Sequence, residues 1–198
     1  MTQQTPPKTR EDCRRVIEPL LPPDRLWHSE CVADAAEALA RQVGADGEKA
    51  MLAGMLHDCA KVFPPEEQRA LCARYGKPLT VEDGRSPKIW HAFAGEAYLA
   101  LNCGVTDQEI LSAVRWHTTG HGGMTKLEET VFVADLISAE RTYPDVEKVR
   151  ELAARDIHAA SIYVLEFIFL NLKRQGRHDC HTATLAWYRE LTQKEDAT

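Results

Sequence analysis

Three features that would assign this chain to a familiar class are missing from its sequence. No stretch approaches the roughly 18 consecutive apolar residues that a membrane-spanning helix needs, because the longest apolar run, over 162–170, is interrupted by Glu166. The six cysteines form no C-x-x-C pair, so we expect reduced thiols and no disulfide framework. Lys and Arg number 24 against 30 Asp and Glu, and this net charge of −6 argues against a protein that binds nucleic acid through a basic face.

The composition is that of an ordinary globular chain. With 198 residues, 44% of them hydrophobic and 27% charged, the sequence can fill the core of one domain and leaves little room for two. We expect a flexible tail over residues 1–8 and a single domain over 9–198. The N-terminus is polar, contains two prolines and lacks the apolar core of a secretory signal, so we expect a cytoplasmic protein.

Helix signals recur along the chain, whereas strand signals do not. Helical patterns run over about 24–43, from after Asp46 to before Pro64, over 87–103, from 144 toward 173, and over about 182–193. Capping boxes at 106–109 and 125–128 start two more helices. The fold class is therefore all-α, a single-domain bundle of about seven or more helices, with the C-terminal helices over 144–194.

Four histidines and two aspartates stand at chemically informative places in five successive predicted helices: His28, His57, Asp58, His91, His117 and Asp135. Asp135 is a lone carboxylate in an apolar run, and no Lys or Arg lies within one helical turn of it. Since a buried, unpaired carboxylate is costly, the sequence predicts that a metal ion is its partner.

The number of these side chains favours two metal ions over one. A single catalytic metal typically uses three protein ligands and keeps one position open, whereas six ligands suit two ions that share a bridging group. Adjacent residues diverge by about 100° around a helix, so Asp58 is placed to lie between the ions while His57 binds one of them. Two such ions about 3.5–4 Å apart clamp the oxygens of a phosphoryl displacement.

This order of residues resembles that of the HD-domain metal-dependent phosphohydrolases, and within them the YqeK-like symmetrical bis(5′-nucleosyl)-tetraphosphatases. The similarity extends over residues 24–160, approximately, and is carried by the segments 50–61, 117–120 and 133–135, the last followed by Arg141. One departure is that Ser138 and Ala139 stand where the family usually has Glu-Pro, which removes a carboxylate near the site.

The resemblance implies an HD domain that hydrolyses diadenosine tetraphosphate to two molecules of ADP with two metal ions, most suitably iron, with manganese or zinc as alternatives. Carried over by position, the first metal would be held by His28, His57, Asp58 and Asp135. The second would be held by His91 and His117, with Asp58 shared. The implied partner is a small nucleotide, without nucleic acid or membrane, and a homodimer is possible.

Several further residues are candidates for contact with the substrate. Asp58 and Lys61 are the expected catalytic groups, and Lys61 reaches the site if its helix continues past His57; the alternative is a solvated lysine. Arg141 is expected to hold a phosphate, unless it forms a surface ion pair. The turn after His117, with Thr118, Gly120 and His121, offers backbone amides to an anion or simply ends a helix.

Two other functions remain open at this point. One is a nucleotide phosphatase of the same superfamily that acts on nucleoside di- or triphosphates. The other is a non-catalytic module that binds a metal or a nucleotide. The remaining histidines lack a comparable context, and we expect surface groups at His158, His178 and His181.

Overall fold

The computed structural model describes residues 5–176 and 180–195, and within these ranges the chain forms ten α-helices, two short 3-10 helices and no strand. This confirms the all-α prediction. In chain order the elements are α1 (Arg10–Ile17), α2 (Pro23–Val43), α3 (Gly47–Leu56), α4 (Pro65–Arg74), η1 (Asp83–Arg85), η2 (Pro87–Ile89), α5 (Trp90–Asn102), α6 (Gln108–Trp116), α7 (Lys126–Ile137), α8 (Val146–Ala153), α9 (Ile157–Arg174) and α10 (Thr182–Glu195). None of these helices is long and apolar enough to cross a bilayer.

The two ends of the chain are only partly described. The predicted flexible tail over 1–8 falls partly on residues 1–4, which lie outside the described residues, and His178 lies outside them as well. Residues 5–8 are described and are not helical, and α1 begins just after its N-cap, Thr9.

Side chains at the helix N-termini fix where the helices begin. The predicted capping box at the start of α7 is present, since Thr125 accepts from the backbone N–H of Glu128 and the Glu128 carboxylate accepts from that of Thr125. Burial alone would raise the pKa of Glu128, but hydrogen bonds from Ser112 and Thr125 outweigh it and lower the pKa. The charged carboxylate is therefore part of the folded structure.

Several predicted helix boundaries are wrong. The helix predicted to run up to Pro64 ends at Leu56, and the α-helix predicted from residue 87 begins at Trp90, after the 3-10 helix η2. Two further helices begin at other N-caps than predicted. The N-cap of α6 is Asp107, not Thr106, because the Asp107 carboxylate accepts from the backbone N–H groups of Glu109 and Ile110. The single helix predicted from 144 to 173 is two helices, α8 and α9, and Asp156 caps the second by accepting from the N–H of His158. In both cases a short acidic side chain competes for the backbone and starts the helix where it lies.

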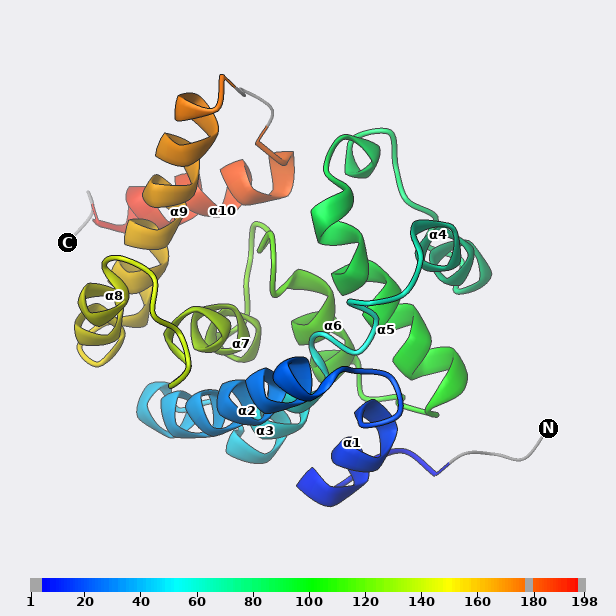
Figure 1. The fold of residues 1–198 in the computed structure, drawn as a ribbon. Coiled ribbons are helices and arrows are strands. Elements are labelled where there is room, and N and C mark those ends of the chain that lie inside the picture. The colour runs from blue at the N-terminus through cyan, green and yellow to red at the C-terminus, as the bar shows by residue number, and fades with distance from the viewer. Residues whose placement is uncertain (1–4, 177–179, 196–198) are drawn as a thin grey trace.

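A close approach of α2 and α3 brings the first part of the predicted site together. A Cβ added to Gly54 would lie only 2.9 Å from the Cα of Ala33, so the two helix backbones touch where this glycine stands. The same contact belongs to a large apolar cluster that α1, α2, α3, α6 and α7 share. Figure 1 shows α2 and α3 side by side, with α7 beside them; His28 lies in α2 and His57 directly follows α3.

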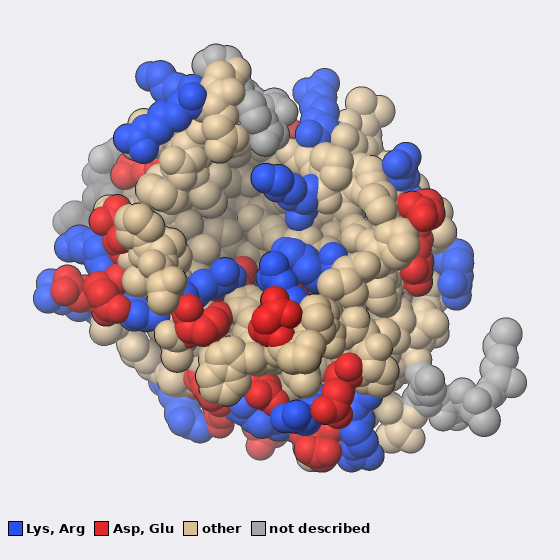
Figure 2. All heavy atoms as spheres, in the orientation of Figure 1, with Lys and Arg blue, Asp and Glu red and all other residues tan. Residues whose placement is uncertain are grey.

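A second apolar cluster joins the C-terminal helices to α7. Trp187 of α10 is 1% exposed and packs edge-to-face against Phe132 of α7, with ring centroids 4.8 Å apart. In Figure 1, α9 and α10 stand on one side of the molecule and α4 and α5 on the other, with the turn that follows α6 between them. Figure 2 shows that this face of the molecule is hollowed near its middle.

Candidate metal centre

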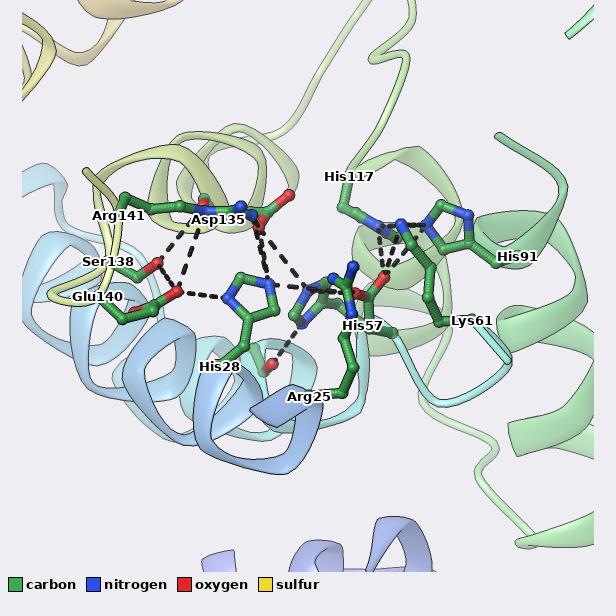
Figure 3. A network of polar contacts seen from close by, with 12 residues as sticks. Arg25, His28, His57, Lys61, His91, His117, Asp135, Ser138, Glu140 and Arg141 are labelled. Atoms are coloured by element: carbon green, nitrogen blue, oxygen red, sulfur yellow. Dashed lines mark hydrogen bonds and ion pairs between the residues drawn. The ribbon is translucent and has the colours of Figure 1, made fainter. Parts of the chain in front are cut away.

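The structure brings together all six residues that the sequence singles out. His28 is in α2, His57 and Asp58 follow directly after α3, His91 is the second residue of α5, His117 follows α6 and Asp135 is in α7. Five of them are at most 5% exposed, and the side chain of Asp135 is 18% exposed. Figure 3 shows the four imidazoles in a row, with Asp135 beside His28 and with His91 and His117 at the other end.

Asp58 lies at the middle of this row, and its two carboxylate oxygens face opposite ends. Oδ2 lies 3.7 Å from His57 Nε2 and 4.0 Å from His28 Nε2. Oδ1 lies 3.1 Å from His91 Nε2 and 3.7 Å from His117 Nε2. This is the arrangement of a carboxylate that can bridge two cations, one at each end.

Hydrogen bonds on the far side of three imidazoles aim their Nε2 atoms at the centre. The Nδ1–H of His57 donates to the carbonyl of Gly54, and that of His117 donates to the carbonyl of Val114, each at 2.7 Å. His28 Nδ1 lies 2.5 Å from a carboxylate oxygen of Glu140. When Nδ1 carries the proton, Nε2 has a free lone pair, which is the form of histidine that binds metals.

The centre contains a polar atom that no described residue satisfies. His57 Nε2 is fully buried and makes no hydrogen bond within the described part of the chain. Asp58 Oδ1 is also buried, and its partners there are the ion pair with Lys61 at 3.5 Å and the nearby Nε2 atom of His91 at 3.1 Å. The Nε2 atoms of His91 and His117 lie only 3.2 Å apart. Buried polar atoms without partners are rare in proteins, so a cation between these groups fits the donor set.

Three triads within the six residues have ligand atoms close enough to share an ion. Within each triad the atoms lie within 4.8 Å of one another. The triads are His28, His57 and Asp58; His57, His117 and Asp135; and Asp58, His91 and His117. The donors are imidazoles and carboxylates, which suit iron, manganese or zinc.

The pKa shifts of His57 and Asp58 favour the form of each group that binds a metal, whereas that of His28 does not. Burial alone would lower the pKa of His28, but the carboxylates of Asp135 and Glu140 outweigh it and raise the pKa. Burial lowers the pKa of His57 to about 4, so its imidazole is neutral at pH 7. Burial alone would raise the pKa of Asp58, but the neighbouring His57, His117 and His91 outweigh it and hold the pKa well below its usual value. Neutral imidazoles and ionised carboxylates are the forms that a metal ion requires.

Lys61 reaches the centre, although not by the predicted route. The sequence predicts that the helix continues past His57, but α3 ends at Leu56 and Lys61 lies in the turn that follows. From this turn, its Nζ donates to His91 Nε2 at 3.1 Å and lies 3.5 Å from Asp58 Oδ1. The ammonium group is therefore beside the His91 end of the centre.

Arg141 corrects the argument that Asp135 has no cation partner in the chain. Its guanidinium forms an ion pair with the Asp135 carboxylate, and its Nε donates to the Asp135 carbonyl at 2.7 Å. The loop after α7 folds back and places Arg141, six residues along the chain, beside this side chain. A metal ion is thus one of two positive partners available to Asp135, not the only one.

Two residues of the network were missed by the sequence reasoning. Arg25 lies one turn before His28 on α2, and its Nη1 is 3.3 Å from Asp58 Oδ2; the i, i+3 spacing could have indicated it. Glu140 is the carboxylate beside His28, and Ser138 donates a hydrogen bond of 2.8 Å to the same Glu140 oxygen. The carboxylate expected to be lost at position 138 is therefore replaced by one two residues later.

Packing against Trp187 of α10 fixes the conformation of the turn after His117. Gly120 has a φ of 58°, and a Cβ there would lie 2.2 Å from the Trp187 ring, so only glycine fits. His121 Nε2 lies 3.2 Å from Glu128, and its ring contacts Trp116. The Thr118 hydroxyl is buried and has no hydrogen-bond partner in the described part of the chain.

Of the other described histidines, His158 is exposed as predicted, whereas the predicted surface position of His181 is wrong. His181 is half-buried, with its side chain 14% exposed, and its Nε2 lies 3.0 Å from the buried carboxylate of Asp83. His158 is 53% exposed but pairs with the buried carboxylate of Glu129 at 2.9 Å. Both histidines therefore serve as partners of buried acids.

Comparison with known proteins assigns the fold and the site to one class. The family model of the HD domain matches residues 25–140, which is more than half of the chain and includes all six residues of the centre. The chain therefore belongs to the HD domain family.

Relatives from bacteria give a finer comparison. The chain is similar to "Bis(5'-nucleosyl)-tetraphosphatase, symmetrical" of Bacillus subtilis (strain 168), with 38% identity over 84% of this chain and 90% of that protein. It is also similar to the protein of the same name from Halalkalibacterium halodurans, with 36% identity over 89% of this chain and 94% of that protein. A crystal structure from Clostridium acetobutylicum, described as a "predicted HD superfamily hydrolase involved in NAD metabolism", matches with a TM-score of 0.89 and 30% identity over 94% of this chain and 98% of that chain.

Proposed function

We propose that this protein hydrolyses diadenosine tetraphosphate symmetrically to two molecules of ADP, with two metal ions in the His/Asp centre. The observation that carries the proposal is the position of Asp58, whose two oxygens face two different pairs of imidazoles. The relatives named as symmetrical tetraphosphatases support the substrate, since they match nearly the whole length of the chain.

These distances support the two ligand sets that the family resemblance implies, as do the distances of 3.0 Å and 3.9 Å from Asp135 Oδ1 to His28 Nε2 and His57 Nε2. One ion would be held by His28, His57, Asp58 and Asp135, and the other by His91, His117 and Asp58. When bound, such ions supply a nucleophile at neutral pH and neutralise charge on the phosphoryl oxygens. Iron is the proposed metal, and manganese and zinc suit the same donors.

Three cationic side chains of the protein are proposed to bind the phosphates of the substrate. Lys61 donates to His91 and lies beside Asp58, so its ammonium can bind a phosphoryl oxygen at that end of the centre. Arg25 and Arg141 lie toward the other end, each next to a ligand carboxylate. Together they stabilise the negative charge that develops on the phosphates in a phosphoryl transfer.

The remaining substrate contacts are proposed on the turn after His117. The unpartnered Thr118 hydroxyl and the backbone near Gly120 are close in sequence to a metal ligand and are proposed to contact the phosphate chain. His121 is proposed to contact the same chain, although its contacts in this structure are with Glu128 and Trp116.

Product analysis tests the proposal directly. Protein loaded with iron or manganese is incubated with diadenosine tetraphosphate, and the nucleotides are separated by ion-exchange chromatography. Water adds across the bond between the second and third phosphates, so two ADP are expected per substrate consumed. ATP plus AMP would contradict the symmetrical cleavage. Turnover only of nucleoside di- or triphosphates would indicate another phosphatase of the superfamily, and no turnover of any nucleotide would indicate a non-catalytic module.

A cytoplasmic location and a homodimer are also part of the proposal. The exposed apolar side chains of Phe167 and Leu170 on α9, 37% and 45% exposed, support a contact between two copies. Light scattering of the purified protein tests the dimer, and a monomer at micromolar concentration would contradict it.

A further inference from the structure

An ion cluster outside the ligand set joins α5 to α6, which lie side by side in Figure 1. His91 lies in α5, and His117 directly follows α6. Glu96 of α5 is 2% exposed, and its carboxylate accepts hydrogen bonds from Lys77 at 2.5 Å and from Arg115 of α6 at 2.7 Å. Together, Glu96, Lys77 and Arg115 form the Glu96 cluster.

The two cations of the cluster hold the carboxylate from two directions. Lys77, in the segment after α4, donates to Oε1 of Glu96, whereas Arg115 donates to Oε2. A buried carboxylate is costly without such partners, and its hydrogen-bonded ion pairs are directional. The cluster therefore favours one relative position of the elements that it joins.

Two aromatic rings contact the guanidinium of Arg115. Its Cζ lies 4.5 Å from the ring centroid of Phe93 and 4.9 Å from that of Trp116, and the two rings meet edge-to-face at 6.0 Å. Phe93 belongs to α5 and Trp116 to α6, so the guanidinium bridges the two helices. Because the side chain of Arg115 is only 20% exposed, little water competes for these contacts.

The cluster flanks a close approach of α5 and α6. A Cβ added to Gly95 would lie 3.2 Å from Val114 Cγ1 and 3.6 Å from the carbonyl oxygen of His57. Gly95 directly precedes Glu96, and Val114 directly precedes Arg115. The ion pair therefore lies next to the point where α5 meets both α6 and the turn that carries His57.

This approach is one helical turn from the His91 and His117 end of the centre. Gly95 lies four residues after His91, on the same face of α5. Val114 lies three residues before His117, and its carbonyl accepts the 2.7 Å hydrogen bond that directs His117 Nε2 toward the centre. Since the Nε2 atoms of His91 and His117 lie 3.2 Å apart, a shift of α5 along α6 would change their separation.

We propose that the Glu96 cluster is a positioning device for the second metal ion, which is assigned to His91, His117 and Asp58. The ion pair between Glu96 and Arg115 sets the register of α5 against α6, and that register sets the separation of the two imidazoles. This inference rests on the proposed function for the second ion, and its test measures metal binding instead of turnover.

The test measures how many Mn²⁺ ions bind and whether they lie together. Metal-free protein is titrated with Mn²⁺ against a fluorescent chelator, which gives an affinity for each ion. Electron paramagnetic resonance is recorded at the Mn²⁺ concentration that just fills both sites of the wild type. Two ions that share the Asp58 carboxylate are magnetically coupled, and their signal differs from that of an isolated ion. Urea titrations of the metal-free proteins give the unfolding midpoints.

Three variants of the cluster are compared with one control. Glu96→Gln removes the charge and keeps the shape, and Arg115→Lys keeps the ion pair without the guanidinium. Glu96→Leu/Arg115→Met removes both charges, so that neither is left buried without its partner. Glu129→Gln is the matched control, because Glu129 of α7 is also 2% exposed and pairs with His158 and Ser161 of α9.

We expect Glu96→Gln to weaken binding of the second ion by about tenfold and to leave the first within about twofold. Arg115→Lys is expected to weaken the second ion by less than about threefold, since a cation still pairs with Glu96. Glu96→Leu/Arg115→Met is expected to regain most of the lost unfolding midpoint, because apolar replacement of a buried ion pair is often neutral. Its second ion should nevertheless stay weak, and its signal should be that of an isolated ion. Glu129→Gln should lower the midpoint and leave both affinities within about twofold.

Other results overturn the inference. Equal affinities for the second ion in Glu96→Gln and Glu129→Gln would show that the cluster contributes to stability alone. Wild-type binding of both ions by Glu96→Leu/Arg115→Met would exclude the ion pair from positioning, and this variant decides the question if Glu96→Gln does not fold. An equal loss at both sites would indicate a general loosening of the fold. Each of these results leaves the proposed function intact, whereas a wild type that binds a single Mn²⁺ would overturn the two-metal centre together with this inference.

Discussion

Replacing Glu140 tests whether a carboxylate outside the ligand set holds the centre in place. Its oxygen lies 2.5 Å from His28 Nδ1 and also accepts a hydrogen bond from Ser138, while its side chain is only 21% exposed. This contact fixes the ring of His28 and keeps its Nε2 directed at Asp135, 3.0 Å away. Without the contact to Glu140, the imidazole ring of His28 can rotate. Part of the free energy of metal binding is then needed to fix the ring.

The size of the effect follows from the strength of such a contact. A hydrogen bond to a charged group contributes about 1.5–3 kcal/mol, which corresponds to roughly 10- to 150-fold in an equilibrium constant. Loss of the partner behind a metal-bound histidine typically costs about 10- to 100-fold in affinity. We expect about tenfold for Glu140→Gln, which keeps an acceptor, and close to 100-fold for Glu140→Ala.

The assay is competition for Mn²⁺ or Fe²⁺ between metal-free protein and a fluorescent chelator. Glu147→Gln is the matched control, since Glu147 is 76% exposed and, among the described residues, forms its ion pair with Arg150 on α8. Ser138→Ala removes the hydrogen bond to the Glu140 carboxylate and is expected to weaken binding by about fivefold. If Glu140→Gln and Glu147→Gln bind the metal equally, Glu140 does not position His28 and the reasoning is refuted.

Three further outcomes are expected. Asp58→Ala should lose both bound metal and hydrolysis, measured by metal analysis and ADP release; a variant that keeps both would remove Asp58 from the bridge. Gly120→Ala should lower the free energy of unfolding by about 2 kcal/mol or more, because its Cβ meets Trp187 and its φ is positive. Gly123→Ala, which has a positive φ and open space, should lose only about 1 kcal/mol in the same urea titration; equal losses would contradict the clash. Because the folded pKa of Glu128 is lowered, its contribution to stability is present above its ordinary value of 4.5 and is lost as pH falls through the folded pKa. Stability of Glu128→Gln should therefore fall less steeply below that pH, and an unchanged acid profile would exclude the effect.

The sequence was sufficient to predict which six side chains lie together, because each of them is in or next to a helix with a clear pattern. Helices that pack in one domain bring such positions together, and the His-Asp pair after α3 marks where they meet. The sequence contains no comparable pattern that predicts the path of the loops between the helices. Arg141 reaches Asp135, and Glu140 reaches His28, because the loop after α7 turns back on the helix. No periodicity in the sequence indicates this turn.

The helix boundaries are predicted wrongly for a related reason, since the sequence pattern does not fix the local path of the chain where a helix begins. Asp107 and Asp156 each cap a helix that sequence reasoning began elsewhere or did not begin at all. Several side chains near a boundary can accept the first free N–H groups, and propensity alone does not choose among them. The choice depends on which turn of the helix packs against its neighbours, which is known only from the folded structure.

The acidic composition and the anionic substrate are compatible because charge is distributed unevenly. The net charge is −6, yet Lys61, Arg25 and Arg141 all lie at the centre, and Arg85 and Lys88 line a cavity beside it. Figure 2 shows Lys and Arg side chains around the hollow on this face. At physiological salt, charges more than about 8 Å from a ligand are largely screened. The local cations, not the net charge, therefore decide which ligands this face can bind, and a compact polyphosphate fits them better than an extended nucleic acid backbone.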